Sequence, residues 1–178
     1  MADSRTSTGS CRVRLIGVGS PHGDDRAGWS VAERLAELDP QKKEEALPMG
    51  RGGVSIVSVA TPIDLLEYLD GVEQLQVCDA FVGDGPAGRL YRWLWPEAAI
   101  EQTRFVGSHD ISLAAALQLA ESLGLLPAQV VVWGIDVGPS PCCVPPASAD
   151  RFSTTLETGI RAAVQQIAAE LSQWARHA

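Results

Sequence analysis

Hydrophobic positions along the chain follow two alternating patterns. Short apolar runs, typical of buried strands, are separated by longer stretches with apolar residues at the 3.6-residue spacing of a helix. The runs predict strands at residues 12–18, 54–59, 75–80, 89–94 and 130–135. The fourth run alternates apolar and polar residues, which suits a more exposed strand that is antiparallel or lies at a sheet edge.

Helical spacing predicts helices between these strands, at residues 26–38, 62–68, 108–123 and about 150–175. Ser108 stands where it can cap the third helix, and Gly124 occupies the position just past its end. Strands that alternate with helices indicate an α/β fold. We therefore expect a single domain over residues 12–178, after a disordered tail at 1–11, with residues 41–53 as a surface loop. Its sheet is expected to be twisted, mostly parallel and five-stranded, flanked by helices on both faces.

Composition narrows the classes of partner. The 178 residues are 46% hydrophobic and carry a net charge of −8, which disfavours binding to a phosphate backbone and so excludes nucleic acid as an expected partner. No apolar run approaches the roughly 18–20 residues of a membrane helix, and the first ten residues lack a signal peptide's apolar core. We therefore expect a cytoplasmic monomer with no membrane contact. Its cysteines, Cys11, Cys78, Cys142 and Cys143, are expected to be free thiols.

Polar residues that can carry chemistry follow the predicted strands. Asp24 and Asp25 come after a glycine turn, Asp79 ends the third strand, His109 opens a helix, and Asp136 ends the last strand. Functional groups in parallel sheets gather at the carboxyl ends of the strands. Two carboxylates and an imidazole can therefore converge there, a set that suits a divalent metal.

Other interpretations of these residues remain open at this point. The glycine turn departs from the dinucleotide fingerprint at His22, so no nucleotide is expected. Asp24 and Asp25 can also serve simply to complement a helix dipole, and His109 can be an ordinary helix-start residue. Asp79 is harder to explain structurally, because a buried carboxylate without a partner is costly. The motifs of serine hydrolases with a nucleophile elbow and of zincins are absent from the sequence.

Four segments in order resemble the hydrogenase maturation endopeptidase family: GVGSPHGDDRAGWSVAERL, QVCDAFV, SHDISLAAAL and VVVWGIDV. The resemblance implies a twisted sheet between helices and an endopeptidase, classed as aspartic-type, that removes a C-terminal peptide from the precursor large subunit of a nickel–iron hydrogenase after metal insertion. It implies that Asp25, Asp79 and His109 contact the metal and share catalysis, with Asp24 in support. The nickel is then supplied by the substrate.

The sequence also departs from the family pattern. Ser20 stands where the family often has Asn, and Val59-Ala60-Thr61-Pro62 replaces an Asp-Gly-Gly stretch that is thought to help read the substrate. A non-proteolytic, metal-sensing scaffold in hydrogenase assembly is therefore the main alternative. An unrelated α/β metallohydrolase acting on a small molecule is a further one.

Overall fold

The computed structural model describes residues 11–38, 53–107, 111–139 and 152–176. Within these ranges the chain forms one sheet of six strands: β1 (Cys11–Val18), β2 (Val54–Val59), β3 (Val72–Val82), β4 (Leu90–Leu94), β5 (Arg104–Phe105) and β6 (Gln129–Asp136). Their order across the sheet is β2-β1-β3-β6-β4, and β5 pairs with β3. β1, β2, β3 and β6 are parallel, whereas β4 and β5 run antiparallel to their neighbours.

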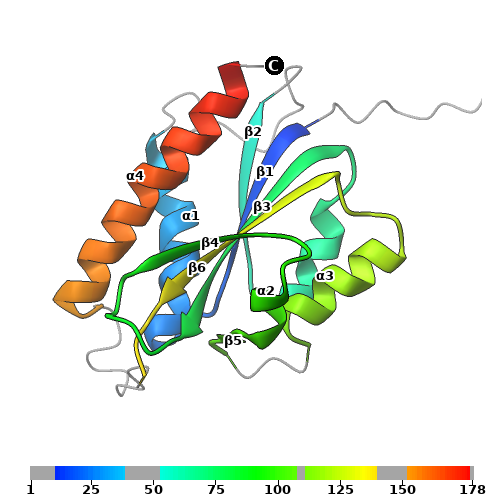
Figure 1. The fold of residues 1–178 in the computed structure, drawn as a ribbon. Coiled ribbons are helices and arrows are strands. Elements are labelled where there is room, and N and C mark those ends of the chain that lie inside the picture. Colours follow the sequence, from blue (N-terminus) through cyan, green and yellow to red (C-terminus); the bar gives the residue numbers. More distant parts are fainter. Residues whose placement is uncertain (1–10, 39–52, 108–110, 140–151, 177–178) are drawn as a thin grey trace, which may run out of the picture.

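Helices cover both faces of this sheet (Figure 1). α1 (Ala27–Leu38) and α4 (Thr154–Arg176) lie side by side on one face. The other face carries η3 (Pro62–Tyr68), α2 (Ala98–Gln102) and α3 (Leu113–Ser122), each of which contributes side chains to a core cluster on that face. A short 3-10 helix, η1 (Gly23–Arg26), leads from β1 into α1.

The two helical layers explain the composition of the central strands. β3 and β6 are buried on both faces, and β6 is accordingly a nearly continuous apolar run. β3 also buries three polar residues, Gln74, Gln76 and Asp79. One core cluster joins the sheet to α1 and α4, and a second joins it to η3, α2 and α3. Such a two-sided core leaves the carboxyl ends of the parallel strands as the edge at which polar groups can meet.

The predicted fold class is confirmed, including the antiparallel edge strand β4. The sheet has six strands instead of five, because β5 has two residues and is too short to leave a hydrophobic pattern. Gly124 lies just past α3 with φ +68°, as predicted. No helix in the described part of the chain is both long enough and apolar enough to cross a membrane.

Two predicted boundaries are wrong. α3 begins at Leu113 and not near Ser108, because the Ser112 hydroxyl accepts a hydrogen bond from the Ala115 N–H and caps the helix there. Cys11 belongs to β1 and not to the tail. The rest of the predicted tail, residues 1–10, and all but the last residue of the loop predicted at 41–53 lie outside the described residues.

Candidate active site

Glycines at the end of β1, just after it and at the start of α1 allow the helix to lie close against the sheet. A side chain at Gly17 would come within 2.6 Å of the Gly28 carbonyl oxygen, and one at Gly28 would collide with the Val18 carbonyl. A side chain at Gly19 would collide with the carbonyl oxygen of Asp25. These close approaches seat η1 directly on the carboxyl end of β1. They therefore fix where the acidic pair of the turn lies.

The two acids of that turn have different surroundings. Asp25 is 6% exposed, whereas Asp24 is only partly buried. Asp79 lies in β3 and is completely buried, and the charge of Asp25 acts on it. The structure therefore brings together the two carboxylates that the sequence singled out, one from η1 and one from β3.

This carboxylate pair is incompletely hydrogen-bonded. One Asp79 oxygen, Oδ1, accepts the Ala80 N–H at 2.8 Å. Oδ2 of Asp79 and Oδ1 of Asp25 are buried and meet no donor among the described residues. Burial and the nearby charge of Asp25 raise the pKa of Asp79 well above its ordinary value, although the Ala80 N–H opposes that shift. Binding a proton or a cation would relieve both the desolvation and the repulsion.

The donor chemistry fits a divalent cation in part. Carboxylate oxygens are hard ligands, and two of them here are without protein partners in the described part of the chain. No group of three such ligands is assembled among the described residues. His109, the third predicted position, lies outside those residues.

Asp136 reaches the same edge of the sheet but is a different kind of carboxylate. It is completely buried, and both of its oxygens accept backbone N–H groups: Oδ1 from Gly138 at 2.7 Å and Oδ2 from Gly85 at 3.1 Å. Two satisfied oxygens leave little capacity for a ligand. Asp136 therefore serves the architecture of the edge, in contrast to Asp79.

Cys78, next to Asp79, is a free and completely buried thiol. Burial, and secondarily the charge of Asp79, raise the pKa of the thiol well above its ordinary range. The thiol therefore stays protonated and acts as a small apolar residue, as the sequence suggested.

An aromatic cluster that was not predicted from the sequence lies on the α3 side of the sheet. Phe81, two residues past Asp79 on the same face, packs edge-on against Tyr91 and Trp93 at 5.2 and 5.5 Å between ring centroids. Phe105 joins it at 6.4 Å, and the Trp93 ring fills the space left free by Gly134. The alternation in residues 89–94 was the available signal. It places Tyr91 and Trp93 on one face.

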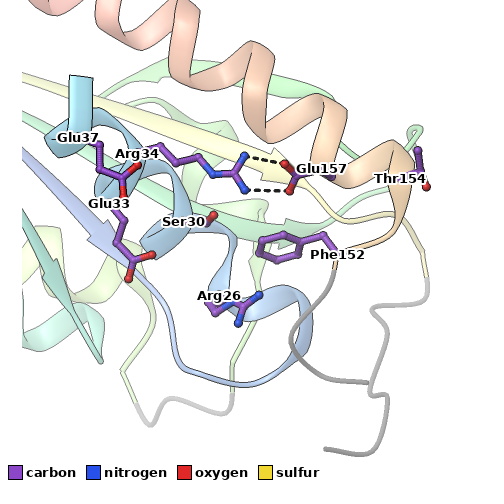
Figure 2. Close-up of a pocket in the computed structure, with 8 residues that line it drawn as sticks. All are labelled: Arg26, Ser30, Glu33, Arg34, Glu37, Phe152, Thr154 and Glu157. Atoms are coloured by element: carbon purple, nitrogen blue, oxygen red, sulfur yellow. Dashed lines mark hydrogen bonds and ion pairs between the residues drawn. The ribbon is translucent and has the colours of Figure 1, made fainter. Parts of the chain in front are cut away.

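A separate cleft of about 610 Å³ lies on the α1 and α4 side (Figure 2). Arg34 of α1 makes two 2.9 Å hydrogen bonds to the carboxylate of Glu157 in α4, and this pairing lowers the pKa of Glu157. The Arg26 guanidinium lies over the Phe152 ring, 5.0 Å from its centroid. Neither Asp25 nor Asp79 lines this cleft. The ion pair between Arg34 of α1 and Glu157 of α4 bridges it.

Comparison with known proteins gives a consistent result for the fold. No protein-family model matches the sequence, and no curated protein matches it. Among solved structures, the hydrogenase maturating endopeptidase HybD from E. coli superposes with a TM-score of 0.62 at 19% identity, over 91% of this chain and 93% of that one. The NiFe hydrogenase maturation protease HycI from Thermococcus kodakarensis KOD1 gives 0.61 at 21% identity, over 90% and 92%.

A third neighbour is a hydrogenase 2 maturation peptidase from a Thaumarchaeota archaeon, with a TM-score of 0.54 at 23% identity. It covers 90% of this chain and 98% of its own. All three identities are too low to establish more than the architecture. The chain therefore has the fold of the hydrogenase maturation peptidases, and the resemblance found in its sequence is confirmed at the level of the fold.

Proposed function

We propose that this protein is an endopeptidase that removes a C-terminal peptide from the precursor large subunit of a nickel–iron hydrogenase once nickel has been inserted. In this proposal the nickel belongs to the substrate, and Asp25, Asp79 and His109 contact it. The observation that carries the proposal is the pair of buried carboxylate oxygens, one on Asp25 and one on Asp79, that meet no donor among the described residues. The shared fold supports it.

The chemistry of the carboxylate pair suits this role. Two buried carboxylates whose charges repel each other favour a divalent cation that enters with the substrate, because the cation relieves their repulsion. A carboxylate at the same place can also accept the proton of the water that attacks the peptide bond. The ion of the substrate polarises the carbonyl of that bond.

Chain connectivity supports the inclusion of His109. The Val106 N–H donates to the Ala80 carbonyl at 2.8 Å, so the chain after β5 begins beside the residue that follows Asp79. His109 is three residues further along, a distance of at most about 11 Å for a fully extended chain. The length of the chain therefore allows His109 to reach the carboxylate pair, as the proposal requires.

The test uses purified nickel-loaded precursor and mass spectrometry of its large subunit. We expect wild-type protein to shorten the precursor, and Asp79→Asn and His109→Ala to lose processing by at least a hundredfold while remaining folded. The matched control is Asp70→Asn, which changes an exposed aspartate and should process normally. Normal processing by either site variant would refute the site. Binding of loaded precursor by the wild type without any loss of mass would instead indicate the scaffold function.

A further inference from the structure

Asp136 fixes the turn that follows β3, residues 83–88. Its Oδ2 accepts the Gly85 N–H, and its backbone carbonyl accepts the Gly88 N–H at 2.7 Å. Its own N–H donates to the Arg89 carbonyl at 2.9 Å. One residue at the end of β6 thus holds the middle and the end of the turn.

The turn backbone lies directly on this carboxylate. A Cβ atom at Gly83 would lie 2.5 Å from Oδ2 of Asp136, and one at Gly85 would lie 2.7 Å from the same oxygen. Turns rich in Gly and Pro close without a buried carboxylate, and burying one is costly. The carboxylate therefore sets where the turn lies relative to the sheet, which is more than turn closure requires.

The turn borders the candidate active site through the sheet itself. Asp79, Gly134 and Tyr91 are aligned in one row across β3, β6 and β4, so the backbones of Asp79 and Tyr91 are about 10 Å apart. Two residues further along both strands, Asp136 pairs with Phe81. We call residues 83–88, together with Phe81 and Tyr91, the turn–aromatic wall.

The wall is continuous. A Cβ atom at Gly85 would lie 3.4 Å from the Tyr91 hydroxyl, and the Tyr91 ring packs on Phe81. Tyr91 is partly exposed, and the Arg89 guanidinium lies over its ring, 4.9 Å from the centroid. Trp93 stacks on the Tyr91 ring with 5.6 Å between ring centroids, so the uncovered part of the ring is what remains to contact an apolar side chain of an extended polypeptide.

We propose that Asp136 is a positioning residue that holds the turn–aromatic wall in place to receive the extended substrate segment next to the bond that is cut. This inference rests on the proposed endopeptidase function. Asp136 acts through the turn and touches neither the substrate nor the carboxylate pair. Its loss therefore weakens substrate binding and leaves the chemical step intact.

The experiment measures KM and kcat for processing of nickel-loaded precursor. Asp136→Asn keeps one acceptor oxygen and Asp136→Ala keeps none, so KM should rise about tenfold for Asn and further for Ala, with kcat changed by less than about threefold. Gly85→Ala keeps Asp136 but displaces the turn, and it should raise KM as well. Gly53→Ala is the matched control, because a side chain there meets no atom of the described residues within 4 Å.

Hydrogen exchange, read together with KM, distinguishes a turn that positions the substrate from one that only completes the fold. Faster exchange at residues 83–88 in Asp136→Asn, together with an unchanged KM, would overturn the inference, as would a fall in kcat at unchanged KM. If wild-type protein does not cut the precursor, the proposed function fails instead. The wall is then tested by titrating the same precursor: weaker binding to Asp136→Asn supports it, and equal binding overturns it.

Discussion

Replacing Asp79 with Asn should make the protein more stable at neutral pH, even though it removes a residue of the candidate active site. Asp79 is completely buried, one of its oxygens meets no donor among the described residues, and the charge of Asp25 acts on it. The amide removes the charge, keeps an oxygen for the Ala80 N–H, and offers a donor where the unpartnered oxygen was.

The expected gain in unfolding free energy follows from removing the buried charge of Asp79. The amide has no partner shown for its N–H groups either, but it carries no charge to bury or to repel Asp25, so the unfolding free energy of Asp79→Asn should exceed that of wild type by at least about 1 kcal/mol at pH 8. Because the folded-state pKa of Asp79 lies above its unfolded value of 3.8, wild type gains stability as the pH falls through the folded pKa towards 3.8. The advantage of the variant should shrink over the same range.

Urea unfolding at pH 8 and at pH 4.5 measures this, with Asp136→Asn as the matched variant. Asp136 is equally buried, but both of its oxygens accept N–H groups, so its replacement should destabilise the protein by about 1.5–3 kcal/mol. Exposed Asp70→Asn should change stability by less than about 0.5 kcal/mol. If Asp79→Asn destabilises the protein at pH 8 as much as Asp136→Asn does, the account of the unpartnered carboxylate is wrong.

Two further predictions concern the packing of α1. Glu157→Gln should cost about 0.5–1 kcal/mol at pH 7, a small value because the Glu157 and Arg34 side chains are 31% and 33% exposed. Since pairing lowers the folded pKa of Glu157, the difference from wild type should shrink as the pH falls below 4.5; equal differences at pH 7 and pH 3 would contradict this. Gly28→Ala should lower the unfolding free energy by at least about 2 kcal/mol, because its methyl group meets the Val18 carbonyl, while Gly53→Ala stays near wild type in the same urea titration. A Gly28→Ala protein as stable as wild type would show that α1 does not lie so close to the sheet.

The parts of the fold that sequence could predict are those with long local patterns. The buried runs of β1 and β6 and the 3.6-residue stripe of α4 are each eight residues or more, long enough for periodicity to identify them. β5 has two residues and depends on pairing with β3, so it left no signal. The predicted start of α3 is wrong because the prediction places the cap at Ser108, whereas the Ser112 hydroxyl caps the helix.

The candidate site was predictable in outline, but the roles of its residues were not. Asp79 and Asp136 both end apolar strands and look alike in the sequence. They differ because the N–H groups of Gly85 and Gly138 reach Asp136, a contact that depends on how two separate loops meet. Asp25 lies near enough to Asp79 for its charge to act on that carboxylate, and their joint role in a site stays a prediction. His109 as the third member of the site stays a prediction.

The proposed function requires that the carboxylate pair acts on a precursor that already carries its metal. The most direct measurement is the mass of the hydrogenase large-subunit precursor after incubation with wild-type protein, with and without nickel inserted beforehand. We expect the nickel-loaded precursor to lose a C-terminal peptide and the nickel-free precursor to keep its full mass. An unchanged mass of the loaded precursor, or equal cleavage of both forms, would contradict it.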